Sequence, residues 1–325
     1  MTYVNDAWAL TGKCLVTFAL AGVLGACGGE GPTRARNGIA YDELTTGTTP
    51  PRGERISYGP DSLQFGEIRL PAGKTKVPIV VLIHGGCWRA EFDITHLSHA
   101  ADALTRAGYA TWTIEYRRVG NPGGGWPGTF TDVARGLDYT RQLGKRFSRL
   151  DTTRLVIVGH SAGGQLALWA ASRKRGEHLD GVPVAAAPIA VTGVVSLAGI
   201  TDLRSYGTGT GSCNRSVAAL MGGTPAEFPE RYSAVNPAER IPLGVRVRFV
   251  HGKQDSIVPL SESESMLALV RASGGDARLS AIESAGHFDL VAPVSAAWRD
   301  VLGAVRELAA GKRLANTSME RENKR

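Results

Sequence analysis

The fold of this chain is decided by one stretch, Gly159-His160-Ser161-Ala162-Gly163-Gly164. An apolar run of strand character precedes it, and a helix-forming run follows it. Glycines on both sides of a serine let a strand, a sharp turn and a helix approach one another closely. This strand–turn–helix setting predicts a strained turn that presents Ser161 as a nucleophile.

Apolar runs of strand length alternate with helix-length segments along most of the chain. The expected strands are residues 64–70, 78–83, 110–116, 155–159, 193–197, 245–250 and 277–282. The expected helices are residues 94–107, 129–147, 165–173, 260–272 and 296–309. Val- and Ile-rich strands that alternate with helices predict an α/β fold, in which helices cover both faces of a mostly parallel central sheet.

One segment, residues 201–242, breaks this alternation. It is rich in Gly, Ser and Pro and contains a single short helical piece, near residues 217–221. It follows an expected strand, at the edge where a parallel sheet presents its carboxyl ends. Long irregular connections at that edge form lids or binding loops, so we expect a cap insertion within one domain.

The first 27 residues have the features of an export signal. Lys13 precedes an apolar run that is too short to span a bilayer. The run ends in Leu-Gly-Ala-Cys, which resembles a bacterial lipobox with Cys27 as the acylated residue. We therefore expect a lipoprotein signal peptide over residues 1–27, and an exported protein anchored by lipid to a membrane of the bacterial cell envelope or periplasm. A plain signal peptide and a buried apolar helix are the alternatives.

The rest of the composition is that of an ordinary globular protein: 43% of the 325 residues are apolar and 21% are charged. Residues 28–55 predict a flexible linker, residues 56–310 the catalytic domain, and residues 311–325 a charged tail. The net charge of +7 is not gathered in a basic run with interleaved aromatics, so we expect no nucleic-acid partner. No residues have metal-ligand spacing, and we expect no metal or other cofactor.

A second glycine-rich stretch directly follows the expected strand at residues 78–83 and reads His84-Gly85-Gly86-Cys87-Trp88. Acyl transfer to a serine creates a tetrahedral oxyanion, which preorganised backbone N–H groups stabilise. We expect one donor from Ala162 and another from Gly86 or Cys87. His84 is expected to brace this loop by hydrogen bonds rather than to act as a base.

A nucleophilic serine requires a base, and the base requires an acid that orients it. His287 lies in a loop just after the last expected strand. Asp255 lies in a turn that follows the expected strand at residues 245–250, at the edge of the sheet where an acid is needed. The chain order Ser161, Asp255, His287 predicts a catalytic triad, with Asp202 and Asp289 as the rival acids.

Two tryptophans are candidate substrate-binding residues. Trp126 lies in a glycine-rich loop, residues 117–128, at the carboxyl end of an expected strand. We expect it to wall the substrate pocket together with Trp88. The alternative is that Trp126 only anchors its own loop.

Two of the four cysteines remain for a disulfide. If Cys14 is cleaved off and Cys27 is lipidated, Cys87 and Cys213 form an even remainder in an oxidising compartment. A bond between them would pin the cap over the nucleophile. Two unrelated buried thiols are the alternative.

With these motifs the chain resembles an α/β hydrolase over about residues 56–309. The H-G-G-x-W and G-H-S-A-G-G stretches are similar to those of the branch that contains kynurenine formamidases and small esterases, including bacterial carbohydrate acetyl and feruloyl esterases. The resemblance implies an α/β-hydrolase fold with a cap insertion. It also implies a serine carboxylesterase that acts on a small-molecule ester through an acyl-enzyme.

Three other functions stay open. An arylformamidase would use the same groups on an N-formyl amide, but export favours an ester over an intermediate of cytosolic tryptophan catabolism. The G-x-S-x-G-G ending also resembles prolyl-oligopeptidase-type peptidases, whose large propeller domain is not expected here. A non-catalytic surface binding protein would lack a member of the triad, and none is missing. The oligomeric state is left open.

Overall fold

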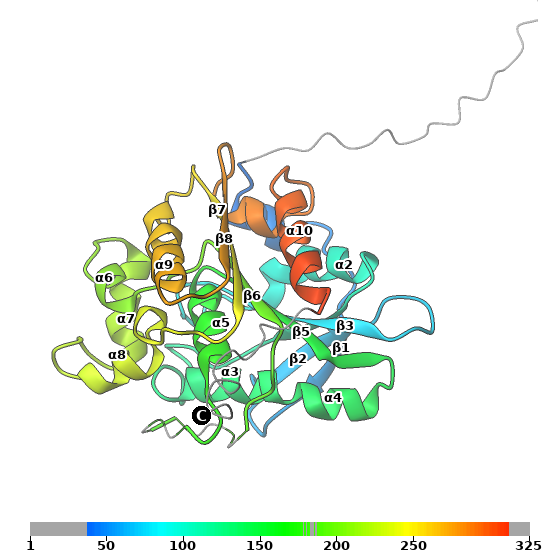
Figure 1. The fold of residues 1–325 in the computed structure, drawn as a ribbon, viewed down its shortest axis with the longest axis horizontal. Helices are drawn as coiled ribbons and strands as arrows, with labels where there is room; N and C mark the ends of the chain where they lie inside the picture. Colours follow the sequence, from blue (N-terminus) through cyan, green and yellow to red (C-terminus); the bar gives the residue numbers. More distant parts are fainter. Residues whose placement is uncertain (1–37, 178, 180, 183–184, 186, 312–325) are drawn as a thin grey trace, which may run out of the picture. The chain divides into compact units, whose positions relative to one another are not determined.

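A computed structural model describes residues 38–177, 179, 181–182, 185 and 187–311. The predicted signal peptide with Cys27, the predicted linker up to residue 37 and the predicted tail beyond residue 311 lie outside the described residues. The described strands form an eight-stranded sheet in the order β1-β2-β4-β3-β5-β6-β7-β8 (Figure 1).

The sheet is mostly parallel. Its strands are β1 (Glu54–Ser57), β2 (Phe65–Arg69), β3 (Val77–Ile83), β4 (Ala110–Ile114), β5 (Leu150–His160), β6 (Gly193–Leu197), β7 (Arg246–Gly252) and β8 (Ala277–Ile282). Strand β2 runs antiparallel to β1 and β4, whereas every neighbouring pair from β4 to β8 is parallel. The predicted parallel α/β sheet is confirmed. Because the carboxyl ends of its parallel strands share one edge, the loops after β3, β5, β7 and β8 meet there.

The helices follow the predicted alternation with the strands. The α-helices are α1 (Tyr41–Thr45), α2 (Ser98–Arg106), α3 (Gly128–Asp138), α4 (Thr140–Arg146), α5 (Ala162–Ser172), α6 (Leu203–Tyr206), α7 (Ser212–Met221), α8 (Pro229–Val235), α9 (Leu260–Ala272) and α10 (Trp298–Ala309). Short 3₁₀ turns are η1 (Ile94–Leu97), η2 (Pro237–Glu239) and η3 (Phe288–Val291). Within the described ranges, no helix combines the length and the apolar character that a membrane span requires.

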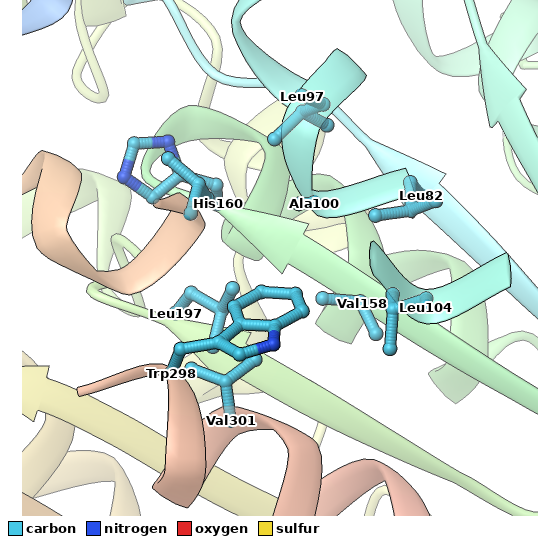
Figure 2. A pocket seen from close by; sticks show the side chains of 10 residues that line it. Leu82, Leu97, Ala100, Leu104, Val158, His160, Leu197, Trp298 and Val301 are labelled. Atoms are coloured by element: carbon cyan, nitrogen blue, oxygen red, sulfur yellow. The ribbon is translucent and has the colours of Figure 1, made fainter. Parts of the chain in front are cut away.

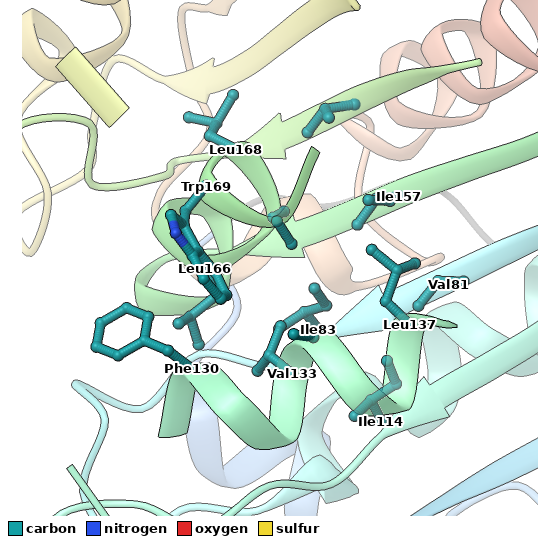
Figure 3. Packing of buried hydrophobic residues seen from close by; sticks show 14 of the residues in the cluster. Val81, Ile83, Ile114, Phe130, Val133, Leu137, Ile157, Leu166, Leu168 and Trp169 are labelled. Carbon is teal, nitrogen blue, oxygen red and sulfur yellow. The ribbon is translucent and has the colours of Figure 1, made fainter. Parts of the chain in front are cut away.

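Alternating side chains of the central strands build two separate apolar cores, since successive residues of a strand point to opposite faces. On one face, Leu82 packs in a cluster with Leu104 of α2 and Val301 of α10 (Figure 2). On the other face, Ile83 packs with Leu166 of α5 and with residues of α3 (Figure 3). Helices therefore cover both faces, as the sequence predicts.

The segment predicted as a flexible linker, residues 28–55, contains α1 and the start of β1. The prediction is wrong at these two elements. Strand β1 lies at the edge of the sheet and buries only Ile56, so its sequence shows little apolar alternation. Helix α1 buries Leu44 alone, while the Tyr41 ring packs on Phe92 and Phe288, two rings that are distant in sequence.

The cap between β6 and β7 is more helical than predicted. Residues 201–242 form α6, α7, α8 and η2, not only a short piece at residues 217–221. Gly222 ends α7 in a left-handed conformation, and Pro229 occupies the first turn of α8. Both residues are common helix boundaries, but in sequence they also suit an irregular loop.

A disulfide joins Cys87 to Cys213. Cys87 lies in the loop after β3, and Cys213 is buried in the first turn of α7. Their Cα atoms are 4.9 Å apart, although 126 residues separate them in sequence. The bond attaches the cap directly to the glycine-rich loop at the carboxyl edge of the sheet.

We predict that Cys213→Ala lowers both stability and turnover. Cross-linking so large a loop is worth up to about 5 kcal/mol in the chain-entropy account, and the loop after β3 loses its attachment to α7. Denaturant unfolding and steady-state kinetics measure the two effects. Peptide mapping without reductant supplies the control, because free thiols at Cys87 and Cys213 in protein from an oxidising compartment would contradict the bond.

Candidate active site

Ser161 occupies a strained turn between β5 and α5. Its φ of 57° and ψ of −123° lie outside the regions that residues with a side chain prefer. The turn is held by hydrogen bonds on both sides: the Ser161 N–H donates to the Leu197 carbonyl at 2.9 Å, and its carbonyl accepts from the Gly164 N–H at 2.8 Å. Such strain persists only where the surrounding structure fixes it, and it marks functional sites.

The glycines around Ser161 are required by close backbone approach. A Cβ on Gly159 would lie 2.2 Å from the Gly163 carbonyl oxygen, and a Cβ on Gly163 would lie 2.2 Å from that of Ile83. No real side chain tolerates such distances. The predicted strand–turn–helix is therefore present, with β3, β5 and α5 in direct backbone contact.

His287 lies in the loop between β8 and η3, and its ring is oriented by a carboxylate. The His287 Nδ1 donates to Asp255 Oδ2 at 2.7 Å. Asp255 lies in the loop after β7, where its other oxygen accepts the N–H groups of Ile257 and Val258 at 2.8 and 2.9 Å. The predicted base and acid are thus brought together, and Nε2 of His287 is the ring nitrogen left for a substrate proton.

The environment of Asp255 favours its ionised form. Burial alone would raise the pKa of Asp255, but the neighbouring His251, with Nε2 3.5 Å from Oδ2, and the hydrogen bond from His287 hold that pKa well below its usual range. His251 is itself buried, with Nε2 donating to the Val258 carbonyl at 2.9 Å and Nδ1 lying 2.8 Å from Ser263 Oγ. Asp255 therefore presents a fixed negative charge to His287.

The two rival acids have other partners. Asp202 caps α6 by accepting the Arg204 N–H at 3.0 Å and also accepts from Asn236 at 2.8 Å. Asp289 is fully buried and accepts the Gly286 N–H at 2.8 Å. Asp289 holds the shape of the loop that carries the candidate base.

The loop after β3 runs against the Ser161 turn. A Cβ on Gly85 would lie 2.9 Å from the Ser161 Cβ. The next three residues, Gly86, Cys87 and Trp88, all have positive φ (99°, 52° and 56°), which turns successive peptide groups of this loop. Ala162 is the first residue of α5, and N–H groups in a first helical turn have no intrahelical acceptor. The expected oxyanion donors at Gly86 or Cys87 and at Ala162 therefore lie on two segments that meet at Gly85 and Ser161.

Buried polar groups brace the same loop from behind. His84 contacts Glu115 Oε1 through Nε2 at 3.0 Å, and Glu115 also pairs with Arg118. The Tyr116 hydroxyl donates to the His84 carbonyl at 2.7 Å, and the two rings stack at 4.3 Å. His84 thus has the bracing contacts that the sequence predicts for it.

The two tryptophans do not share a pocket. Trp88 is 0% exposed and belongs to the core beneath the loop, so the prediction that it contacts substrate is wrong. Trp126 instead lines a groove of about 830 Å³ with Phe228 and Arg231 of the cap side, and none of the three predicted triad residues lines that groove.

Sequence reasoning missed a buried row of histidines beside His287. The His160 ring lies 4.5 Å from that of His287, and the His96 ring lies 5.5 Å from that of His160. The only signal for His160 was its position inside the G-x-S-x-G stretch, and His96 carried none. Within the described part of the chain, no group of three or more His, Cys, Asp or Glu side chains is placed to hold a metal ion.

Both added histidines are held neutral. Burial, followed by the neighbouring His84, lowers the pKa of His96 to about 3. Burial, followed by His287 and His96, lowers the pKa of His160 well below its usual value. In the unfolded chain, each of the two rings takes up a proton near pH 6.5.

We predict that acidification from pH 7.5 to 5 destabilises the fold through these two rings. The unfolded state binds protons that the folded state cannot, so the free energy of unfolding falls as the pH is lowered, by about 2 kcal/mol at pH 5 for His96, with a further loss from His160. Urea unfolding at both pH values measures the change. In His96→Asn, whose amide can still donate to the Asp93 carbonyl, the loss should be about 2 kcal/mol smaller. Equal losses in the variant and the parent would contradict this assignment.

Known proteins match this chain in sequence and in fold. A dipeptidyl peptidase family member 2 from Caenorhabditis elegans is 24% identical over 234 residues, which cover 64% of this chain and 26% of that protein. A probable isoprenylcysteine α-carbonyl methylesterase from Oryza sativa subsp. japonica is 22% identical over 242 residues, covering 72% of this chain and 58% of that protein. The chain thus spans less than two thirds of either relative.

Solved structures share the fold. A truncated carbohydrate esterase from gut microbiota superposes with a TM-score of 0.66 at 22% identity, covering 82% of this chain and 98% of that one. A protein-family model described as BD-FAE matches residues 67–269, which include β3 to β7, Ser161 and Asp255. Since that match extends over more than half of the sequence, the chain belongs to the BD-FAE family of α/β-hydrolase esterases.

Proposed function

We propose that this esterase cleaves a carboxylic ester of a small acyl or aryl group through an acyl-enzyme on Ser161. His287 is the general base and Asp255 orients it. The observation that carries the proposal is the 2.7 Å hydrogen bond from His287 Nδ1 to Asp255, in loops that meet at the carboxyl edge where β5 ends in the strained Ser161.

The reaction proceeds in two matching steps. His287 Nε2 takes the Ser161 hydroxyl proton as Oγ attacks the ester carbonyl, and Asp255 stabilises the imidazolium that forms. The oxyanion is stabilised by the N–H of Ala162 and by that of Gly86 or Cys87. His287 then gives its proton to the leaving alcohol, and water repeats the sequence on the acyl-enzyme.

We predict that Ser161→Ala lowers kcat by at least about 10³-fold while the fold stays intact, because triad members act as a unit. Ester turnover and thermal unfolding measure the two quantities. The matched control is Ser148→Ala, an exposed serine beside the opposite end of β5. A fluorophosphonate probe should label the parent enzyme and the control but not Ser161→Ala. Turnover retained in Ser161→Ala would overturn the nucleophile.

A substrate panel distinguishes the related activities. We expect p-nitrophenyl esters, acetylated sugars or feruloyl esters to be turned over faster than N-formyl-kynurenine. The names of the rice methylesterase and the gut carbohydrate esterase support an ester. The name of the C. elegans relative favours a dipeptidyl peptidase as the second candidate, so the panel includes a dipeptidyl p-nitroanilide. Preference for the formamide or the anilide would overturn the ester proposal.

We also propose that the enzyme is exported and lipid-anchored through Cys27. The support is the sequence alone, in which Lys13, an apolar run and Leu-Gly-Ala-Cys precede a linker. We predict that labelling of cells with radioactive palmitate marks the full chain but not Cys27→Ala, while Cys14→Ala is labelled like the parent. Equal labelling of Cys27→Ala would contradict the anchor.

A further inference from the structure

His160, the residue before the proposed nucleophile, lies between the loop that carries Gly85 and the loop that carries His287. Its side chain is buried and points toward the loop that carries the base. Nε2 of His160 lies 3.1 Å from the His287 backbone carbonyl oxygen. Because a carbonyl oxygen only accepts, Nε2 carries the proton, and this bond fixes the tautomer of His160.

His160 also contacts the loop after β3, which carries the expected oxyanion donor Gly86 or Cys87. A Cβ on Gly85 would lie 2.8 Å from the His160 carbonyl oxygen and 3.4 Å from its Nδ1. The Gly85 backbone therefore runs directly against residue 160. One side chain thus lies between the loop that carries the expected oxyanion donors and the loop that carries the base.

The surroundings keep this ring dry and uncharged. Figure 2 shows the imidazole at one end of an apolar gap, which Leu97, Leu197 and Trp298 also line. This gap is too narrow to admit water. The rings that face it are His287 at 4.5 Å, His96 at 5.5 Å and Phe288 at 5.8 Å. Burial lowers the pKa of His160, so this ring adds no positive charge that would oppose an imidazolium at His287.

We propose that His160 is a positioning residue: its Nε2–H holds the backbone of His287 in register with Ser161 and Gly85, and His160 neither touches substrate nor transfers a proton during the reaction. The proposal rests on the proposed roles of Ser161 and His287. The hydrogen bond fixes the loop that bears the base, and the ring sets the spacing between that loop and Gly85. Small misplacements of a catalytic group are costly in rate.

Three variants separate the hydrogen bond from the volume of the ring. His160→Gln places an amide N–H near the position of Nε2 and cannot titrate. His160→Phe keeps an aromatic ring without a donor, and His160→Asn keeps an amide that is too short to reach the carbonyl. We expect kcat on a p-nitrophenyl ester to fall about 10- to 100-fold in the Phe and Asn variants with KM changed less than about 3-fold, and to stay within about 5-fold of the parent in the Gln variant.

A second readout follows the base itself. The Nδ1 proton shared by His287 and Asp255 should give a downfield proton NMR signal that is retained in His160→Gln and is shifted or lost in His160→Asn. Thermal unfolding verifies that each variant is folded, and if the Phe variant does not fold, the Gln and Asn pair decides.

Two results would overturn the proposal. Parent-like kcat and NMR signal in the Asn or Phe variant would mean that the hydrogen bond is dispensable. Equal losses in folded Gln and Asn variants would mean that the imidazole acts in another way, such as proton transfer. Failure of the triad itself is a separate outcome, because it appears as retained turnover in Ser161→Ala.

Discussion

The backbone of Ser161 is the constraint on which the rest of this structure depends. A residue with a side chain at φ 57° and ψ −123° costs about 1–3 kcal/mol, so the turn survives only while β5, β6 and α5 are fixed around it. Glycine at 159 and at 163 follows from this, because any Cβ there would meet a carbonyl oxygen. The gain is that Ser161 is held at the carboxyl edge of the sheet before substrate arrives.

The loops that meet at this edge carry one ionised carboxylate and two neutral histidines around His287. The loop after β7 contributes an anion, since two histidines keep the pKa of Asp255 low despite its burial. His160 lies beside His287 and His96 lies beside His160, and both are neutral because they are buried. His287 thus has a fixed negative charge at Nδ1 and no competing positive charge from these two rings. In the proposed mechanism, this arrangement would stabilise an imidazolium at His287 without rearrangement.

Much of the fold was predictable because its signals are local. Central parallel strands such as β3 and β6 are Val-rich and buried on both faces, so they stand out as apolar runs, and the glycines around Ser161 mark the turn. The edge strand β1 and the one-turn helix α1 carried no such signal, since each buries a single residue among polar ones. The cap helices were missed for a related reason. They are short, and Gly222 and Pro229 suit helix ends and loops equally well.

The residues of the candidate site also differ in how far the sequence predicts their positions. Residues at strand ends, such as Asp255 and His287, are fixed by the parallel sheet, so their meeting follows from topology. The positions of side chains in the glycine-rich loops depend instead on how each loop packs against the core and the cap. Trp88 is buried in the core, and the ring of Trp126 lies 5.7 Å from the Arg231 guanidinium of the cap. The proposed catalytic groups thus lie at the ends of strands, whereas the two tryptophans are placed by contacts with the core and the cap, and the disulfide from Cys87 to Cys213 joins the cap to the loop after β3.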